Sequence, residues 1–187
     1  MTDNARLTTH KIFLLPDYEK EGEYLTSMHK VGWKLEKACA YSQHFVKCEP
    51  ENVIYKLDYV PVNSNYCEYI KMYSDYGWEH CGRVAGFDYF RRKADGISEE
   101  ELEIFSDVQS KLRMMKKVIM TRMLPLLIIF IGIIIPNFLI FLLDGLKDGM
   151  FWAWAMTGVY TALILIYIAI FAYCIKGFMK LKKKYTE

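Results

Sequence analysis

Cysteine and histidine are the side chains in this sequence whose chemistry is most easily recognised from spacing. Those in the N-terminal half are Cys39, Cys48, Cys67, Cys81, His10, His29, His44 and His80. Structural zinc sites place paired ligands close in sequence, as in C-x-x-C. The nearest pairs here, His80-Cys81 and His44-x-x-x-Cys48, lack that spacing. We expect no metal site, no cofactor, and reduced thiols in the cytoplasm.

Motifs for nucleophilic or phosphate chemistry are missing. The sequence has no G-x-S-x-G turn and no glycine-rich phosphate loop, and Gly82–Gly86 is interpreted as a turn between strands. We therefore expect no catalytic residue and no enzyme activity. An uncharacterised enzyme remains a third alternative, which would depend on Glu23, Glu68 or Asp58.

Aromatic side chains and a few acids indicate binding instead. The first 93 residues are rich in Tyr, Trp and Phe, and aromatic walls with acids can hold an amphipathic cation. Asp58 stands out because Asp is disfavoured inside a strand. We expect the ligand-binding residues to be Glu23, Tyr24, Trp33, Asp58, Glu68, Tyr69 and Trp78. The alternative interpretation is structural, since aromatics fill small cores and Glu on a helix is usually solvated.

An internal repeat predicts the elements that position these side chains. Residues 11–48 align without gaps with residues 56–93, and in both copies Glu-Tyr is followed eight residues later by Gly-Trp. Each copy has the pattern strand, helix, strand, strand. The first strands, Lys11–Leu15 and Val53–Val60, are each followed directly by a proline, Pro16 or Pro61, which ends the strand.

The repeat pattern predicts the fold class. Gly32 and Gly77 follow the two helices, where a residue with positive φ ends a helix at low cost. We expect an α+β fold with a duplicated β-α-β-β unit, in which about six antiparallel strands carry two helices on one face. The seam between the copies is a natural place for a ligand or a partner.

Two long runs without ionisable side chains, residues 123–143 and 151–175, predict membrane spans. They would form a two-helix transmembrane hairpin. A cytoplasmic domain (1–95) and an amphipathic connector helix (96–122) would precede it, and a basic cytoplasmic tail (176–187) would follow.

Charge distribution predicts the location and excludes one class of partner. Lys and Arg flank the outer ends of both runs, so we expect a multi-pass protein of the inner (plasma) membrane with both termini in the cytoplasm. The lipid bilayer is then a partner. The net charge is only +2, so no direct nucleic-acid binding is expected.

The connector helix carries an apolar stripe. Ser98-x-x-Glu101 is typical of a capping box at its start. Apolar residues then recur three and four residues apart, at Phe105, Val108, Leu112, Met115 and Ile119. This stripe could form a homodimer, pack on the sheet or lie on the bilayer surface, and it is too short to decide among them.

Several landmarks occur together: Glu23-Tyr24-Leu25, Gly32-Trp33, Tyr55–Tyr59, Gly77-Trp78-Glu79 and Tyr89-Phe90-Arg91. In this combination the chain resembles the bacterial domain of unknown function 2812 family, whose members carry a soluble N-terminal domain followed by membrane spans. Family members often lie in genomes beside PadR-type transcriptional regulators, so the resemblance implies a regulatory module. The family has no established activity, and no catalytic residue is implied.

These observations lead to one functional hypothesis and its alternatives. We predict a membrane-anchored, non-enzymatic cytoplasmic binding module, acting as a sensor or regulatory adaptor. It would recognise a small molecule or a protein partner such as a PadR-type regulator. The alternative class is a structural or assembly protein of the membrane that acts through its transmembrane hairpin.

Overall fold

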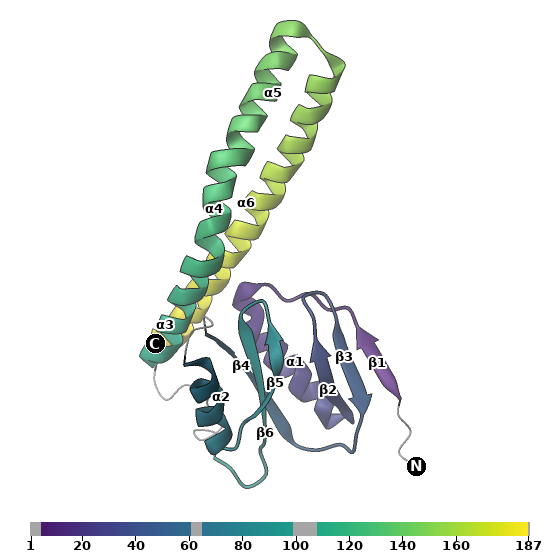
Figure 1. The fold of residues 1–187 in the computed structure, drawn as a ribbon, viewed down its shortest axis with the longest axis vertical. Coiled ribbons are helices and arrows are strands. Elements are labelled where there is room, and N and C mark those ends of the chain that lie inside the picture. The colour runs from purple at the N-terminus through teal and green to yellow at the C-terminus, as the bar shows by residue number, and fades with distance from the viewer. Residues whose placement is uncertain (1–4, 61–64, 99–107, 187) are drawn as a thin grey trace. The chain divides into compact units, whose positions relative to one another are not determined.

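The structure is a computed structural model that describes residues 5–60, 65–98 and 108–186. The chain divides into two compact units, Met1–Met114 and Met115–Glu187. The N-terminal unit has mixed α and β structure (Figure 1). Its elements are β1 (Arg6–Thr9), α1 (Tyr18–Lys30), β2 (Trp33–Ala38), β3 (Gln43–Lys47), β4 (Val53–Tyr59), α2 (Tyr66–Asp75), β5 (Glu79–Val84) and β6 (Phe87–Lys93).

The strands form two small antiparallel sheets, in the orders β1-β3-β2 and β4-β6-β5. The expectation of one sheet of about six strands is therefore wrong. Strands β2 and β5 lie near each other, but each contains a register shift, between Leu35 and Lys37 and between His80 and Gly82. Such bulges bend a strand and increase its local twist, and among the described residues no ladder joins β2 to β5.

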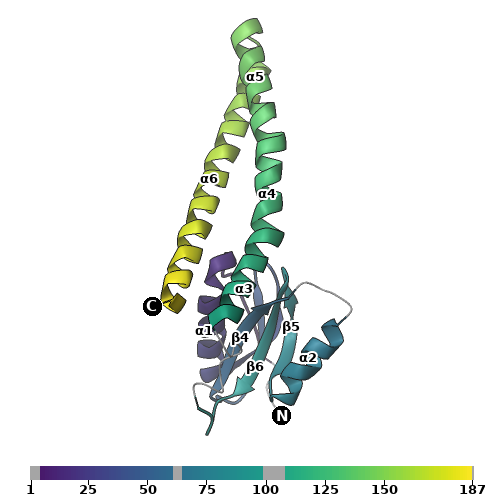
Figure 2. The ribbon, with the colours of Figure 1, turned by 90° about the vertical axis from the view of Figure 1, so that its left-hand side faces the viewer.

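The two helices cover opposite faces of the second sheet (Figure 2). The Tyr89 hydroxyl donates a hydrogen bond of 2.9 Å to Glu21 of α1, whereas Phe90 stacks on Tyr73 of α2 with ring centroids 4.4 Å apart. Adjacent strand residues point to opposite sides of a sheet, so the predicted placement of both helices on one face is wrong. Strand β6 is buried from Phe87 to Arg91, as expected for a strand covered on both sides.

The start of the first half also differs from the prediction. The first strand is β1 at Arg6–Thr9 and not Lys11–Leu15, so this half begins before residue 11. Strand β3 begins at Gln43, which pairs with Thr9. The residues that follow Thr9 therefore have no residue of β3 left to pair with, and β1 ends there. The Gln43 side chain instead donates a hydrogen bond of 3.0 Å to the Lys11 carbonyl.

The two helix ends agree with the prediction from sequence. Gly32 has a φ of 85° and Gly77 has a φ of 80°, which is the left-handed region that favours glycine. Both helices end just before these residues, and the following strands β2 and β5 carry their bulges at matching places, 45 residues apart. The order of elements and of strands is the same in the two halves.

The second unit consists of long helical segments. The segments α3 (Val108–Val118), α4 (Leu124–Ile129) and α5 (Ile135–Asp148) are joined by π-helical turns at Ile119–Met123 and Phe130–Ile134 and form one continuous helix. Each π turn lies just before a proline, Pro125 or Pro136. Proline lacks an N–H and clashes with the preceding turn of an α-helix, and the wider π turn relieves this conflict.

The second long helix, α6 (Phe151–Thr186), follows a short turn in which Gly149 has a φ of 65°. It continues past residue 175, where the sequence predicted a separate tail. Aromatic pairs join it to the preceding helix, with ring centroids 5.2 Å apart for Phe130 and Tyr167 and 5.6 Å for Phe141 and Tyr160.

Both helices are long and apolar enough to cross a membrane, with mean hydropathies of 3.0 and 2.2 in their most apolar windows. Only 6% of each window is buried. Large apolar side chains such as Leu165 and Ile131 are more than half exposed. This weakly indicates association with a membrane, because a helix exposing apolar side chains all round needs an apolar surrounding.

The amphipathic stripe of the connector helix is only partly described. Phe105, Glu101 of the capping box and the Val108 side chain lie outside the described residues. Met115 is buried within the chain, whereas Ile119 is 37% exposed. The homodimer through this stripe stays a prediction, with Leu112 and Ile119 as its accessible members.

Candidate functional site

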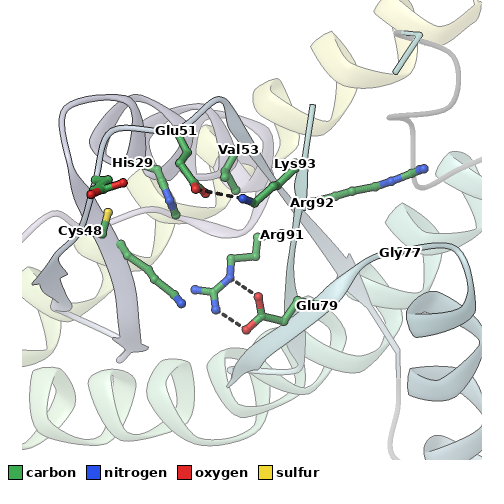
Figure 3. A pocket seen from close by; sticks show the side chains of 11 residues that line it. His29, Cys48, Glu51, Val53, Gly77, Glu79, Arg91, Arg92 and Lys93 are labelled. Carbon is green, nitrogen blue, oxygen red and sulfur yellow. Dashed lines mark hydrogen bonds and ion pairs between the residues drawn. The ribbon is translucent and has the colours of Figure 1, made fainter. Parts of the chain in front are cut away.

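A cavity of about 350 Å³ lies in the N-terminal unit (Figure 3). We call it the seam cavity, because its lining combines residues of the first half, such as His29 and Lys34, with residues of the second half, such as Glu79 and Arg91. The link between β3 and β4 supplies Glu49 and Glu51. A cavity of this size is in the range of pockets that hold small molecules.

Arg91 is the buried centre of the cavity wall. Its side chain is 9% exposed and forms a two-pronged ion pair with Glu79, with 2.7 Å between Arg91 Nε and Glu79 Oε2. It also donates a hydrogen bond to the Leu35 carbonyl of the first half. This guanidinium therefore ties β6 to both β5 and β2, and its charge is already matched by a carboxylate.

A second ion pair closes another part of the wall. Lys93 Nζ lies 2.9 Å from Glu51 Oε1. Both side chains are substantially exposed, so this pair contributes little to stability. It does neutralise one cation and one acid of the cavity.

His29 presents one ring nitrogen to the cavity. Its Nδ1 is 2.9 Å from the Tyr55 hydroxyl, and the ring is almost fully buried. No described residue forms a hydrogen bond with Nε2. Every fully buried side-chain nitrogen in the described chain has a hydrogen-bond partner, so Nε2 is not fully buried. Since His29 lines the cavity, Nε2 borders its open space. Burial lowers the pKa of His29, and the charge of Arg91 lowers it further, so the imidazole is neutral near pH 7.

Lys34, Cys48 and Arg92 also belong to the polar lining. No described residue forms an ion pair with the Lys34 ammonium. Burial raises the pKa of the Cys48 thiol, so the thiol stays protonated at neutral pH and is a poor nucleophile. The cavity thus offers a cation and an imidazole for hydrogen bonding, without an activated nucleophile.

The structure brings three of the seven predicted binding residues together, in a cluster beneath α2. Tyr69 donates a hydrogen bond of 2.7 Å to Asp58, and Tyr73 donates to the same oxygen at 3.2 Å. Trp78 packs in the buried cluster with Tyr73 and Phe90, against which Tyr69 also rests. Burial raises the pKa of Asp58, although the two tyrosine hydrogen bonds oppose the shift.

The other four predicted residues lie apart from that cluster. Glu23 and Glu68 are exposed on their helices. Tyr24 donates a hydrogen bond of 3.0 Å to Thr9 and carries the Lys11 ammonium 4.3 Å above its ring. Trp33 is half-buried beneath the Lys47 ammonium.

None of the seven lines the seam cavity. Sequence reasoning missed its residues, although Glu79 and Arg91 stand within the landmarks that carried the family resemblance. His29 was considered only as a metal ligand. Lys34 offered no signal, because an isolated lysine on a strand looks like any solvated side chain. Among the described residues, no group of three or more His, Cys, Asp or Glu side chains could hold a metal ion.

The fold and the cavity define a protein with an N-terminal α+β unit that contains a polar cavity, followed by two long apolar helices. The sequence profile of the family described as "Protein of unknown function (DUF2812)" matches residues 17–130. The chain belongs to this family, as the landmarks predicted. No curated protein and no solved structure matches the chain.

Proposed function

We propose that this protein is a membrane-anchored, non-enzymatic binding module whose seam cavity takes a small molecule carrying an acidic group. One observation carries the proposal: both halves build the cavity, and among the described residues it leaves the Lys34 ammonium without an ion pair and His29 Nε2 without a hydrogen bond. A carboxylate or phosphate oxygen could accept charge-assisted hydrogen bonds from Lys34. The predicted amphipathic cation suits this cavity less well, since no Phe, Tyr or Trp of the described ranges lines it.

A ligand in the seam cavity would act on the contact between the halves. Arg91 already links β6 to Glu79 and to the Leu35 carbonyl. A ligand that binds more tightly when the two halves are in contact than when they are separated stabilises the contact, by the difference between its two binding free energies. The bound state could then be recognised by a partner, which is how a sensor or adaptor works. A PadR-type regulator remains the predicted partner from the family resemblance.

The two halves are proposed to be copies of one β-α-β-β unit. The matching strand orders, the two glycines with positive φ and the bulges 45 residues apart support this. The two apolar helices are proposed to span the inner membrane as a hairpin with both termini in the cytoplasm. Basic residues beyond the ends of both runs, such as Lys116 and Lys183, support that orientation.

The test uses the full chain in lipid nanodiscs and a panel of small carboxylates and phosphomonoesters. We expect at least one of them to raise the unfolding temperature, and Lys34→Gln to weaken its binding about tenfold, the loss of one charge-assisted hydrogen bond. Lys37→Gln is the matched control, because Lys37 is exposed on the same strand and does not line the seam cavity.

Two results would contradict the proposal. One is that no acidic compound binds, while the other is that the Lys34 and Lys37 variants lose affinity equally. A purified PadR-type regulator is assayed separately by co-purification with and without the acidic ligand. Ligand-independent capture would favour a protein adaptor over a small-molecule sensor.

A further inference from the structure

We propose that a second cavity, beside Glu21, binds an organic ammonium ion. This cavity has a volume of about 90 Å³ and is lined by both halves of the N-terminal unit. It shares no lining residue with the seam cavity. The site therefore goes beyond the proposed function, and its ligand has the opposite charge.

Aromatic rings form much of the wall. Phe13, Tyr18, Phe87 and Tyr89 line the cavity. Tyr18 and Phe87 stack with ring centroids 6.0 Å apart and planes 18° from parallel, and both are almost fully buried. Rings held in this way keep their faces in fixed positions, and aromatic faces attract a cation that has lost part of its hydration shell.

Glu21 supplies the acid of the cavity. It is only 8% exposed and accepts a hydrogen bond of 2.9 Å from the Tyr89 hydroxyl. No Lys, Arg or His among the described residues forms an ion pair with it. A buried carboxylate normally has a cationic partner or takes up a proton. Burial raises the pKa of Glu21, although hydrogen bonds from Tyr89 and Gln43 oppose the shift. Without a cation its charged form is disfavoured, and an ammonium in the cavity would offset that cost.

The lining favours an organic cation over a metal ion. Among the described residues, Glu21 is the only carboxylate that lines this cavity, and the other polar lining side chains are Gln43, Cys39 and the two tyrosines. A hard metal ion needs several oxygen ligands, whereas an alkylammonium needs one counter-ion and aromatic walls. The Lys11 ammonium stands 5.4 Å above the Phe13 ring but is not part of the lining. The small volume fits an ammonium head group whose substituent extends through the opening.

The experiment compares choline with 3,3-dimethyl-1-butanol, its neutral carbon analogue, on the full chain in lipid nanodiscs, by isothermal titration calorimetry. We expect choline or benzyltrimethylammonium to bind at least about tenfold more tightly than the neutral compound. Glu21→Gln should remove that preference. Glu23→Gln is the matched control on the same helix, because Glu23 is exposed and does not line the cavity.

A second variant covers the case in which Glu21→Gln alters folding. Ala40 is exposed and lines the cavity, so Ala40→Leu should obstruct it and weaken ammonium binding without changing the acid. The proposal is overturned if no ammonium compound binds, if the neutral analogue binds as tightly, or if both variants bind ammonium as the unchanged protein does. Lys34→Gln should leave ammonium binding unchanged, which separates this site from the seam cavity.

Discussion

Asp58 and Asp88 lie directly opposite each other across the antiparallel pair of β4 and β6. Both are almost fully buried beneath α2. Like charges in this position normally destabilise a sheet, but each carboxylate has its own donors. Asp58 accepts hydrogen bonds from Tyr69 and Tyr73. Asp88 accepts them from Tyr66 at 2.5 Å, His80 at 3.0 Å and Arg83 at 3.1 Å.

This arrangement predicts unequal effects of removing the two charges. Asp88→Asn deprives Arg83 of its ion pair in a mostly buried site and should lower the free energy of unfolding by about 3 kcal/mol. Asp58→Asn keeps an oxygen acceptor for neutral tyrosine donors and should cost less than about 1 kcal/mol. Denaturant titration followed by tryptophan fluorescence measures both losses, and Trp78, which packs beside Tyr73, reports on this site. Equal losses of unfolding free energy in the two variants would contradict this prediction, which assigns the larger loss to the acid paired with Arg83.

Acidification should destabilise the protein through His29. Its folded-state pKa lies below the ordinary value of 6.5 because of burial and the nearby Arg91 charge. As the pH falls below about 6.5, the unfolded chain binds a proton that the folded state does not, so stability is lost until the pH reaches the folded-state pKa. The slope is at most about 1.4 kcal/mol per pH unit for one proton.

The measurement is the free energy of unfolding between pH 7 and pH 5, for the unchanged chain and for His29→Gln. The variant should show a shallower decline. His10→Gln is the control, because His10 is exposed. If both variants keep the full slope, other groups carry the pH dependence.

Gly22 allows α1 to approach β4 closely. A Cβ added at this residue would lie 2.7 Å from the Tyr55 carbonyl oxygen, which belongs to the backbone and cannot move aside alone. Gly22→Ala should therefore destabilise the N-terminal unit by about 1–3 kcal/mol, although alanine has the higher helix propensity. Ser27→Ala, on the exposed side of the same helix, should have a much smaller effect in the same denaturant titration.

A charge in the middle of α6 should prevent membrane insertion. Leu165 is 63% exposed near the middle of the run from 151 to 175. Leu165→Arg should cost about 2.5–3.5 kcal/mol of insertion free energy. Membrane fractionation measures this effect, with Met179→Arg as the control near the basic end of the helix. Equal recovery of both variants in the membrane fraction would contradict a span at Leu165.

Cysteine reactivity tests the second sheet. Cys81 is half-buried in β5, and burial raises its pKa to about 11. Cys67 is exposed on α2. Since the thiolate is the reactive form, a maleimide reagent at pH 8 should label Cys67 well before Cys81. Mass spectrometry of the peptides over time measures both rates, and equal rates would contradict the position of β5.

Much of the chain's organisation is encoded locally. The glycine pair at 32 and 77 predicted two helix ends. The apolar runs predicted two long helices, both of which extend beyond the predicted bounds, to Gln109–Asp148 and Phe151–Thr186. Asp58 was singled out because a strand disfavours aspartate, and it lies in a buried hydrogen-bonded cluster with Tyr69 and Tyr73. These features depend on φ preference, hydropathy and β propensity, which are properties of single residues and their neighbours.

The sheets and the cavities depended on contacts between distant residues. The strands fall into two sheets, and no ladder joins β2 to β5 among the described residues. Gly82, with a φ of 128°, stands at the bulge of β5, but β2 has no glycine at its matching bulge. Arg91 meets the Leu35 carbonyl, and Glu21 meets Tyr89, only because the two halves pack together. The sequence alone determined where this chain is apolar, where α1 and α2 end and to which family it belongs. Only the tertiary structure decided which charges are buried together and which cavities they line, because burial arises from packing between segments far apart in the chain.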